Sequence, residues 1–259
     1  MSPAPPLPPK GHGLLSGKTV LVTAAAGTGI GFAVAKRCVE EGAAVMLSDR
    51  HERRLGEAAA ELGGGKGPLP HRACDVTDED QVKSLARAAA DELGRVDVLV
   101  NNAGLGGYAR VVDMTDAQWS QVLDVTLTGT FRVTRAVLPG MLERGSGVIV
   151  NNASVLGWRA QEGQAHYAAA KAGVMALTRC VAMEAAEAGV RVNAVAPSIA
   201  MHEFLAKVTP EGLLDELTSR EAFKRAAEPW EVANVIVFLA SDYSSYMTGE
   251  VIAVSSQHP

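Results

Sequence analysis

Three side chains in the middle of the chain have the types and the spacing needed for acid–base chemistry on an alcohol or a ketone. Tyr167 and Lys171 lie four residues apart, so on a helix both would face the same side. A free tyrosine has a pKa of about 10 and is a poor base at neutral pH. A neighbouring ammonium and a cationic cofactor both favour the phenolate and so lower this pKa. Ser154, thirteen residues before the tyrosine, can donate a hydrogen bond to the substrate oxygen. We therefore predict Ser154, Tyr167 and Lys171 as catalytic residues.

A glycine-rich turn near the N-terminus predicts a nucleotide site. The segment Thr23–Gly31 follows a β-branched run and precedes a helix-like stretch. Its small residues let the backbone approach a pyrophosphate, whose charge then rests on the N–H groups and the positive end of the helix. The candidate contacts in this turn are Ala25, Gly27, Gly29 and Ile30. Since loops often use glycine merely to turn, this motif alone is weak evidence.

The second predicted strand supports the nucleotide site because it ends in an acidic residue. Asp49 lies eighteen residues beyond Gly31. A carboxylate at this place accepts hydrogen bonds from both ribose hydroxyls of an adenine nucleotide and repels a 2′-phosphate. Asp49 therefore favours NAD as the cofactor. Arg50, Arg53 and Arg54 leave NADP as the less favoured alternative, although they also fit the exposed first turn of the next helix.

Short apolar runs alternate with amphipathic helical stretches along almost the whole chain. The predicted strands are Thr19–Thr23, Ala44–Ser48, Leu69–Cys74, Val96–Val100, Gly147–Asn151, Val190–Val195 and Glu250–Val254. The predicted helices are Ile30–Glu41, Glu52–Leu62, Glu79–Leu93, Asp116–Leu138, His166–Ala188 and Pro229–Ser241. Strict alternation implies a parallel sheet covered by helices on both faces. We therefore expect an α/β fold with a doubly wound, Rossmann-type sheet of seven parallel strands in a single domain.

The first 13 residues differ in composition from the rest of the chain. They contain five of the twelve prolines and show no apolar period, which argues against a helix. No linker or change in composition divides the remaining residues. We expect a Pro-rich flexible tail over residues 1–13 and one dinucleotide-binding domain over residues 14–259.

The overall composition excludes several classes of function. Of the 259 residues 47% are hydrophobic, and the formal net charge is −5, whereas nucleic-acid binding needs a basic surface. No apolar run approaches the ~18 to 20 residues of a membrane span, and no leader pattern begins the chain. The three cysteines and six histidines lack the spacing of a disulfide framework or a metal site. We expect a cytoplasmic protein without a metal, a membrane or a nucleic-acid partner.

These motifs, in this order, resemble the short-chain dehydrogenase/reductase family in its shorter, single-domain subtype. The resemblance covers residues 14–259 and includes further motifs after the third and fourth predicted strands. It implies a nicotinamide cofactor that exchanges a hydride with an alcohol or a ketone. In such a protein Tyr167 is the acid/base and Lys171 also holds the nicotinamide ribose. Further cofactor contacts implied by the resemblance are Asp75, Val76, Asn102, Ala103, Gly104, Ala200 and Tyr167 itself. The resemblance also implies a homotetramer built partly from the helices Asp116–Leu138 and His166–Ala188.

The chain departs from the family pattern in three places. The glycine turn has one extra residue and begins with Ala24, so we expect a different local path of the phosphate loop. Thr126 stands where the family has an asparagine that bends its helix and anchors a water in the proton relay, and a threonine hydroxyl can also hold water. The family's Pro-Gly with a following threonine near the carboxamide appears as Pro197–His202. The family's contacts to the nicotinamide carboxamide can therefore not be assigned to individual side chains of this segment.

Three segments, residues 151–161, 225–230 and 254–257, further resemble family members of bacterial sterol degradation. Those enzymes act on a CoA thioester of a hydroxylated methyl-hydrindanone, the bicycle left from sterol rings C and D. We therefore expect as substrate a CoA thioester of a bulky cyclic hydroxy or keto compound. A 3-oxoacyl-thioester reductase is the alternative enzyme, and an NAD(H)-sensing Rossmann protein is the alternative without turnover.

The segment Ser198–Phe223 follows the sixth predicted strand and carries apolar residues that suit a substrate lid. Lys207, Arg159 and Arg220 are candidates to meet CoA phosphates at its rim. His166 precedes the catalytic tyrosine and points about 100° away from it on a helix, so we expect it at the surface or in contact with substrate.

Overall fold

The computed structural model describes residues 4–201 and 212–256. Seven parallel strands form one sheet in the order β3-β2-β1-β4-β5-β6-β7. They are β1 (Thr19–Thr23), β2 (Ala44–Asp49), β3 (His71–Ala73), β4 (Val98–Asn101), β5 (Gly147–Asn152), β6 (Val190–Pro197) and β7 (Val251–Val254). The predicted single-domain, Rossmann-type α/β fold is thereby confirmed.

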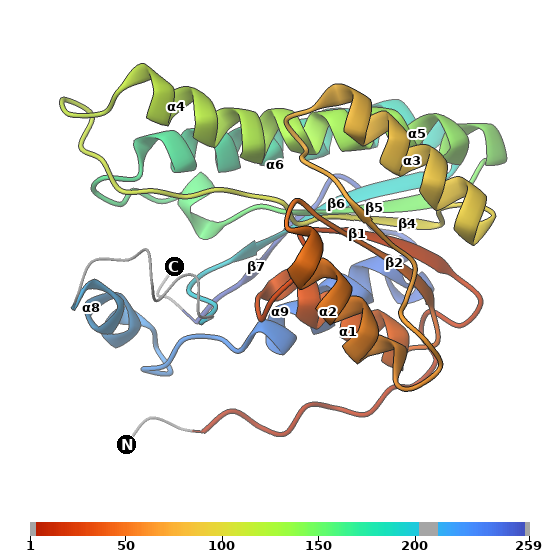
Figure 1. The fold of residues 1–259 in the computed structure, drawn as a ribbon. Helices are drawn as coiled ribbons and strands as arrows, with labels where there is room; N and C mark the ends of the chain where they lie inside the picture. Colours follow the sequence, from red (N-terminus) through yellow and green to blue (C-terminus); the bar gives the residue numbers. More distant parts are fainter. Residues whose placement is uncertain (1–3, 202–211, 257–259) are drawn as a thin grey trace.

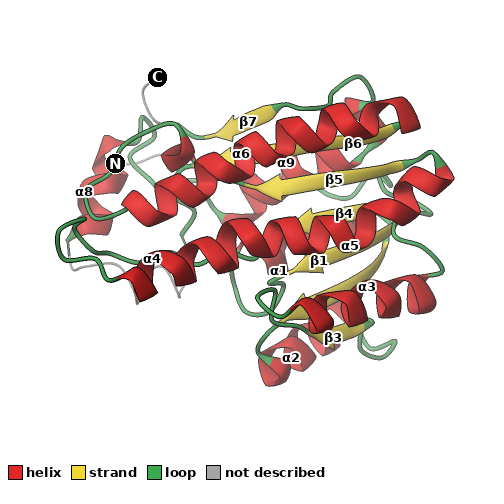
Figure 2. Cartoon of the chain, turned by 90° about the horizontal axis from the view of Figure 1, so that it is seen from above, coloured by secondary structure: helices red, strands yellow, loops and turns green. Residues whose placement is uncertain are grey.

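Helices cover both faces of the sheet (Figure 1). One face carries α1 (Ile30–Glu40), α2 (Glu52–Gly63) and α9 (Pro229–Ala240), and the other carries α3 (Glu79–Leu93), α4 (Asp116–Leu123), α5 (Gly129–Arg144) and α6 (Ala165–Ala185). Each face has its own apolar core, because successive strand residues point to opposite sides. In β1, Val20 and Val22 pack with α1 and α9, whereas Leu21 packs with α3 and α5. From above, α4, α5 and α6 extend across the sheet roughly along its strands (Figure 2).

The third strand is shorter than predicted. It covers His71–Ala73 instead of Leu69–Cys74, since β3 is an edge strand that pairs with only three residues of β2. The N–H of Leu69 bonds outside the ladder, to the carbonyl of Ala59 in α2. The fourth strand begins at Val98 instead of Val96 for a similar reason, because its pairing with β1 starts there.

The helix predicted over Asp116–Leu138 is interrupted and runs further than expected. A π-helical turn, Asp124–Thr128, separates α4 from α5, and α5 continues to Arg144. The N–H of Gly129 reaches back five residues to the carbonyl of Asp124. Such π-turns inside α-helices often mark functional sites, and Thr126 lies at the centre of this one.

The remaining described elements are short. They are α8 (Leu213–Arg220) and the 3₁₀ turns Val155–Gly157, Ala186–Ala188 and Asp242–Ser244. Helix α8 falls in the predicted lid Ser198–Phe223, of which residues 202–211, and Lys207 with them, lie outside the described residues. Within the described ranges, no helix combines the length and the apolar character that a bilayer span requires.

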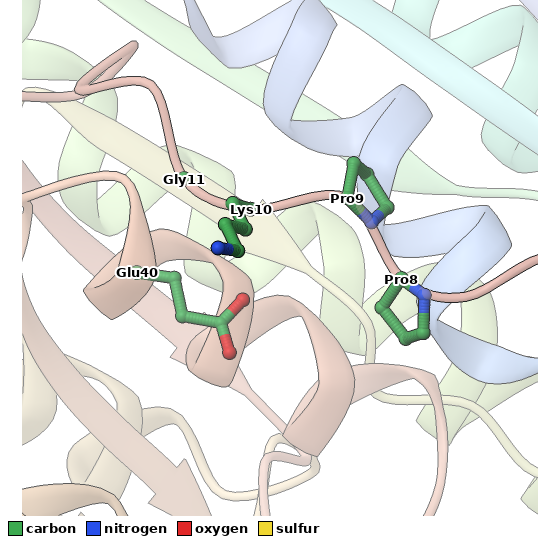
Figure 3. Close-up of a pocket in the computed structure, with 5 residues that line it drawn as sticks. All are labelled: Pro8, Pro9, Lys10, Gly11 and Glu40. Carbon is green, nitrogen blue, oxygen red and sulfur yellow. The ribbon is translucent and has the colours of Figure 1, made fainter.

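The segment before β1 contacts the end of α1 through a buried ion pair. Arg37 and Glu41 pair with each other, and both side chains are almost fully buried. Arg37 also donates to the carbonyls of Pro9 and Lys10, while Glu41 accepts the N–H of His12. A pocket lies between this segment and the last turn of α1, lined by Pro8, Pro9, Lys10, Gly11 and Glu40 (Figure 3).

Candidate active site

The three predicted catalytic side chains converge at the carboxyl edge of the sheet. Ser154 follows β5 and caps a 3₁₀ turn, where its Oγ accepts the N–H of Leu156 at 3.2 Å. Tyr167 and Lys171 lie in the first two turns of α6. Ser154 hydrogen-bonds to Tyr167, and the Lys171 Nζ lies 5.5 Å from the centre of the tyrosine ring. The spacing of four residues therefore places both side chains on one side of α6, as predicted.

The surrounding protein sets the charge of these groups. Desolvation raises the pKa of Tyr167 to about 12, and the hydrogen bond from Ser154 only partly counters it. Desolvation also lowers the pKa of Lys171 to about 8. In the chain itself the cost of a buried phenolate dominates the pKa of Tyr167, which is therefore a neutral phenol at neutral pH. That an ammonium and a cationic cofactor together lower this pKa stays a prediction.

The loop after β4 passes close over the face of α6 that carries the predicted catalytic residues Tyr167 and Lys171, called the catalytic face below. A Cβ built at Gly104 would lie 3.4 Å from the Lys171 Nζ, and one at Gly106 would lie 3.8 Å from the Tyr167 ring. The Lys171 Nζ also donates to the backbone carbonyl of Asn152 at 2.5 Å. These contacts hold the lysine between the ends of β4 and β5.

His166 is buried rather than at the surface. Its side chain is 2% exposed, and its Nε2 would lie 3.2 Å from a Cβ at Gly107. Its Nδ1 has no hydrogen-bond partner among the described residues. Desolvation lowers the pKa of His166. The expected surface position is therefore wrong, because the loop after β4 covers this residue, a contact that helical spacing alone does not reveal.

Thr126 joins the π-turn to the loop after β4. Its buried hydroxyl accepts the N–H of Leu105 at 3.0 Å and donates to the carbonyl of Leu105 at 3.1 Å. The Thr126 carbonyl accepts the hydroxyl of Thr130 at 2.8 Å. The hydroxyl that we expected to hold a water thus anchors the loop that covers Tyr167.

The predicted nucleotide turn lies between β1 and α1 at the same edge. Ala24 adopts a φ of +50°, a region that favours glycine, and its carbonyl accepts the Asn102 Nδ2 at 3.0 Å. A Cβ at Gly31 would lie 2.1 Å from this carbonyl, so only glycine fits there. Helix α1 begins without a side-chain cap and without an acidic residue in its first turn. Its positive end is therefore left for an anion.

The two acidic candidates lie at the ends of β2 and β3. Asp49 accepts the N–H of His51 at 2.9 Å and the N–H of Ala26 at 3.3 Å. Asp75 accepts the N–H and the hydroxyl of Thr77 at 2.9 and 2.7 Å. Asp49 is thus tied to the nucleotide turn, whereas Asp75 organises its own loop.

The other predicted cofactor residues lie at the same carboxyl edge. Ala103 donates its N–H to the Thr23 Oγ1 at 3.2 Å. Ala200 follows β6, is 5% exposed and bridges to Ala227. The carboxyl edge of the sheet thus carries, after successive strands, the candidates Ala25, Gly27, Gly29, Ile30, Asp49, Asp75, Val76, Asn102, Ala103, Gly104, Ser154 and Ala200.

Two polar residues at this edge were not predicted from the sequence. The Thr23 Oγ1 accepts the N–H of Asn102 at 2.9 Å, which ties the end of β1 to the end of β4. The Asn152 Nδ2 donates to the Asn102 Oδ1 at 2.8 Å. The only sequence signal was a polar residue at the end of an apolar strand, which is also usual where a strand simply stops.

Comparison with known proteins agrees with this geometry. The family described as enoyl-(acyl carrier protein) reductase matches residues 24–256. A Mycobacterium tuberculosis protein named (5R,7aS)-5-hydroxy-7a-methyl-1-oxo-2,3,5,6,7,7a-hexahydro-1H-indene-carboxyl-CoA reductase is 66% identical over 251 residues, 96% of each chain. A 3-oxoacyl-(acyl-carrier-protein) reductase from Thermotoga maritima is 42% identical over 93% of this chain and 97% of that one. The crystal structure of a short chain dehydrogenase from Mycobacterium smegmatis has a TM-score of 0.86 at 58% identity and covers 98% of both chains. The chain is therefore an oxidoreductase that belongs to the short-chain dehydrogenase/reductase family, whose members use a nicotinamide cofactor.

Proposed function

We propose that this enzyme interconverts a secondary alcohol and a ketone on a CoA thioester of a sterol-derived bicyclic compound, with NAD(H) as the cofactor. The observation that carries the proposal is the convergence of Ser154, Tyr167 and Lys171 beside the nucleotide turn. The substrate class is supported by 66% identity, over 96% of both chains, to a reductase named for such a thioester.

Tyr167, Ser154 and Lys171 would each have a separate role in this reaction. A nicotinamide held in this site would supply the hydride chemistry at the carbinol or ketone carbon. Tyr167 takes the hydroxyl proton during oxidation and gives a proton to the carbonyl oxygen during reduction, so that atoms and charge balance. Ser154 donates a hydrogen bond to the substrate oxygen. Lys171, when charged, favours the phenolate.

The chain's own residues fit a dinucleotide. The start of α1 has no cap or acidic side chain, and a Cβ at Gly27, which has a φ of +87°, would find nothing within 4 Å. This leaves the open, small-residue cradle that a pyrophosphate needs. Ala25, Gly29 and Ile30 would complete it. Towards the adenine and the nicotinamide, the contacts would come from Asp75, Val76, Asn102, Ala103, Gly104, Lys171 and Ala200.

Asp49 supports NAD rather than NADP. Its carboxylate is tied to the turn through Ala26, at the place where a 2′-phosphate would meet its negative charge. Arg53 pairs with Glu57 on the same helix face, and the Arg50 Nε donates to His51. Two of the three arginines that favoured NADP thus have local partners.

The proposed substrate would lie between the catalytic face and α8. Leu213, Leu214 and Leu217 of α8 are each partly buried and offer apolar cover for a bicycle. Trp158, 52% exposed, follows the 3₁₀ turn after Ser154. Arg220, a candidate for CoA phosphates, donates to Glu216 on its own helix. A phosphate would have to compete with that carboxylate.

The assembly and the setting of the enzyme are also proposals. We propose a homotetramer, as the family resemblance implies, and a cytoplasmic location, which is supported by three cysteines that form no disulfide. We further propose that residues 14–259 make up the dinucleotide-binding domain and that residues 1–13 are an appendage to it.

The proposal is tested by comparing three substrates with both cofactors. Turnover of the CoA ester of a hydroxy-methylhydrindanone acid, of the free acid, and of acetoacetyl-CoA is followed by NADH or NADPH absorbance. We expect kcat/KM for the bicyclic CoA ester to exceed that of the free acid about tenfold or more, because charged phosphate contacts are lost with CoA. A preference for acetoacetyl-CoA would favour the 3-oxoacyl-thioester alternative, supported by the Thermotoga relative. NADH binding without turnover of any of them would favour the sensor.

A further inference from the structure

A continuous series of hydrogen bonds joins the nucleotide turn to the catalytic lysine. The Asn102 Nδ2 donates to the Ala24 carbonyl at 3.0 Å, and the Asn152 Nδ2 donates to the Asn102 Oδ1 at 2.8 Å. The backbone carbonyl of Asn152 accepts the Lys171 Nζ at 2.5 Å. Asn152 therefore links Lys171, through its backbone carbonyl, to Asn102, whose side chain holds the turn.

The sheet register places these residues side by side. Asn101 of β4 and Asn151 of β5 are directly paired, so the next residue of each strand lies at the same carboxyl edge. Because the Asn102 Nδ2 is used by Ala24, its Oδ1 must find a donor. An amide at position 152 supplies that donor, whereas an apolar or a carboxylate side chain would not.

At the nucleotide turn, the series of hydrogen bonds ends at Ala24, whose backbone conformation is strained. Ala24 has a φ of +50°, which is costly for an L-residue with a Cβ. Its carbonyl faces Gly31, where a Cβ would come within 2.1 Å. The hydrogen bond from Asn102 holds this carbonyl and so fixes the path of the turn. The orientation of Asn102 in turn depends on Asn152.

Folding stability alone does not favour an asparagine at position 152. Its Oδ1 is buried and has no hydrogen-bond partner among the described residues, and an unpaired buried acceptor costs free energy. Leucine, which has nearly the same shape, would remove that cost, although it would leave the Asn102 Oδ1 unpaired. These two costs oppose each other, so folding stability gives little preference for asparagine over leucine at position 152.

We propose that Asn152 is a positioning residue of the cofactor site, which through Asn102 fixes the nucleotide turn relative to Lys171. The inference rests on the proposed function, since it assigns the turn to a dinucleotide. Asn152 itself touches neither the turn nor the lysine ammonium with its side chain. It acts on the turn through Asn102, and its own backbone carries the lysine.

The test measures NADH binding by fluorescence and the thermal midpoint of unfolding for the same set of variants. Asn152→Leu is expected to raise the Kd for NADH about threefold to tenfold, the worth of one net hydrogen bond, with little change in the thermal midpoint. Asn102→Ala should weaken NADH binding at least as much. The double variant should bind no more weakly than Asn102→Ala, because both changes break one path. Asn152→Ser, whose hydroxyl can donate, should fall between Asn152→Leu and the wild type.

Thr178→Val is the matched control. It breaks a buried hydrogen bond from the other asparagine of β5, in which the Asn151 Nδ2 donates to the Thr178 Oγ1 at 2.9 Å. This bond does not reach the nucleotide turn. The control should lower the thermal midpoint and leave the Kd for NADH within about twofold of the wild type.

Two results would overturn the inference. One is an unchanged Kd for NADH in Asn152→Leu, with or without a lower thermal midpoint. The other is a double variant in which the two effects on Kd multiply, since Asn102 and Asn152 would then act independently. A wild-type protein that binds neither NADH nor NADPH would instead refute the proposed function, and this inference with it.

Discussion

Replacing Glu41 by alanine should destabilise the protein strongly although this residue lies far from the catalytic groups. The carboxylate is fully buried and accepts the N–H groups of His12 and Leu14 at 2.8 and 2.9 Å. It also pairs with the buried guanidinium of Arg37. Without Glu41, the buried guanidinium of Arg37 would keep only the longer pair with the partly exposed Glu40, at 3.5 Å. Removing one partner of a buried ion pair typically costs about 3–5 kcal/mol, a large share of the about 5–15 kcal/mol that stabilises a typical domain.

Urea unfolding, followed by circular dichroism, measures this cost as the difference in free energy of unfolding between the wild type and Glu41→Ala. The matched control is Glu40→Ala, because Glu40 is the preceding residue and pairs with Lys36 and Arg37 from a partly exposed position. An exposed pair contributes about 0–1 kcal/mol, so this control should stay close to the wild type. A loss in Glu41→Ala no larger than in Glu40→Ala would refute the reasoning.

The pH dependence and a truncation identify the source of this stability. Burial raises the pKa of Glu41, but the N–H groups of Leu14 and His12 and the charge of Arg37 outweigh it, so the net pKa is lowered. The stabilisation is therefore present above the unfolded pKa of about 4.3 and is lost as the pH falls through the lower folded value. Removal of residues 2–13 should reduce the cost of Glu41→Ala, because the N–H of His12 and the carbonyls that anchor Arg37 are then missing.

Four further predictions concern the site. Tyr167→Phe should lower kcat by about 10²-fold or more and leave the Kd for NADH nearly unchanged, and activity within about tenfold of the wild type would exclude the acid/base role. The wild type should prefer NAD(H), and Asp49→Ser should narrow or reverse that preference in kcat/KM, whereas equal use of both cofactors by the wild type would contradict the role of Asp49. Steady-state kinetics should show that Thr126→Ala costs less kcat than Ser154→Ala, and an equal loss would make Thr126 a catalytic residue. Burial lowers the pKa of His166. Below about pH 6.5 the unfolded chain therefore binds a proton that the folded chain does not, so the free energy of unfolding should decrease as the pH is lowered through this range. Urea unfolding of His166→Phe should show a smaller fall, and an identical slope would refute this assignment.

Local patterns were enough to predict the sheet and to select candidate site residues at its carboxyl edge. The strands of the sheet centre are short and apolar on both faces, and each is followed by a helix, so the parallel order followed from the chain itself. Tyr167 and Lys171 were found because their spacing matches one helix face. Asp49 was found because it ends a strand. In each case neighbours along the chain determine the structure.

Contacts between distant parts of the chain account for what the sequence did not show. The π-turn at Thr126 depends on the backbone of Leu105, and the burial of His166 depends on Gly107. The bond between Asn152 and Asn102 needs the register of β4 against β5. The same holds for Arg37, which appears in the sequence as an ordinary charged helix residue. Apart from the ion pairs of Arg37 with Glu40 and Glu41, these partners lie far apart in the sequence, as Pro9 and Lys10 do from Arg37.

The charges of Tyr167 and Lys171 decide which proton transfers the candidate site can make. Because desolvation raises its pKa to about 12, Tyr167 is a proton donor at neutral pH. Reduction of a ketone needs that donor, whereas oxidation of an alcohol needs the phenolate. The pKa of Lys171 is lowered to about 8. Above that pH the lysine is mostly neutral and no longer stabilises a phenolate at Tyr167 by its charge. The neutral Tyr167 can therefore give a proton, and a phenolate at this place would need a nearby positive charge to offset the cost of its burial.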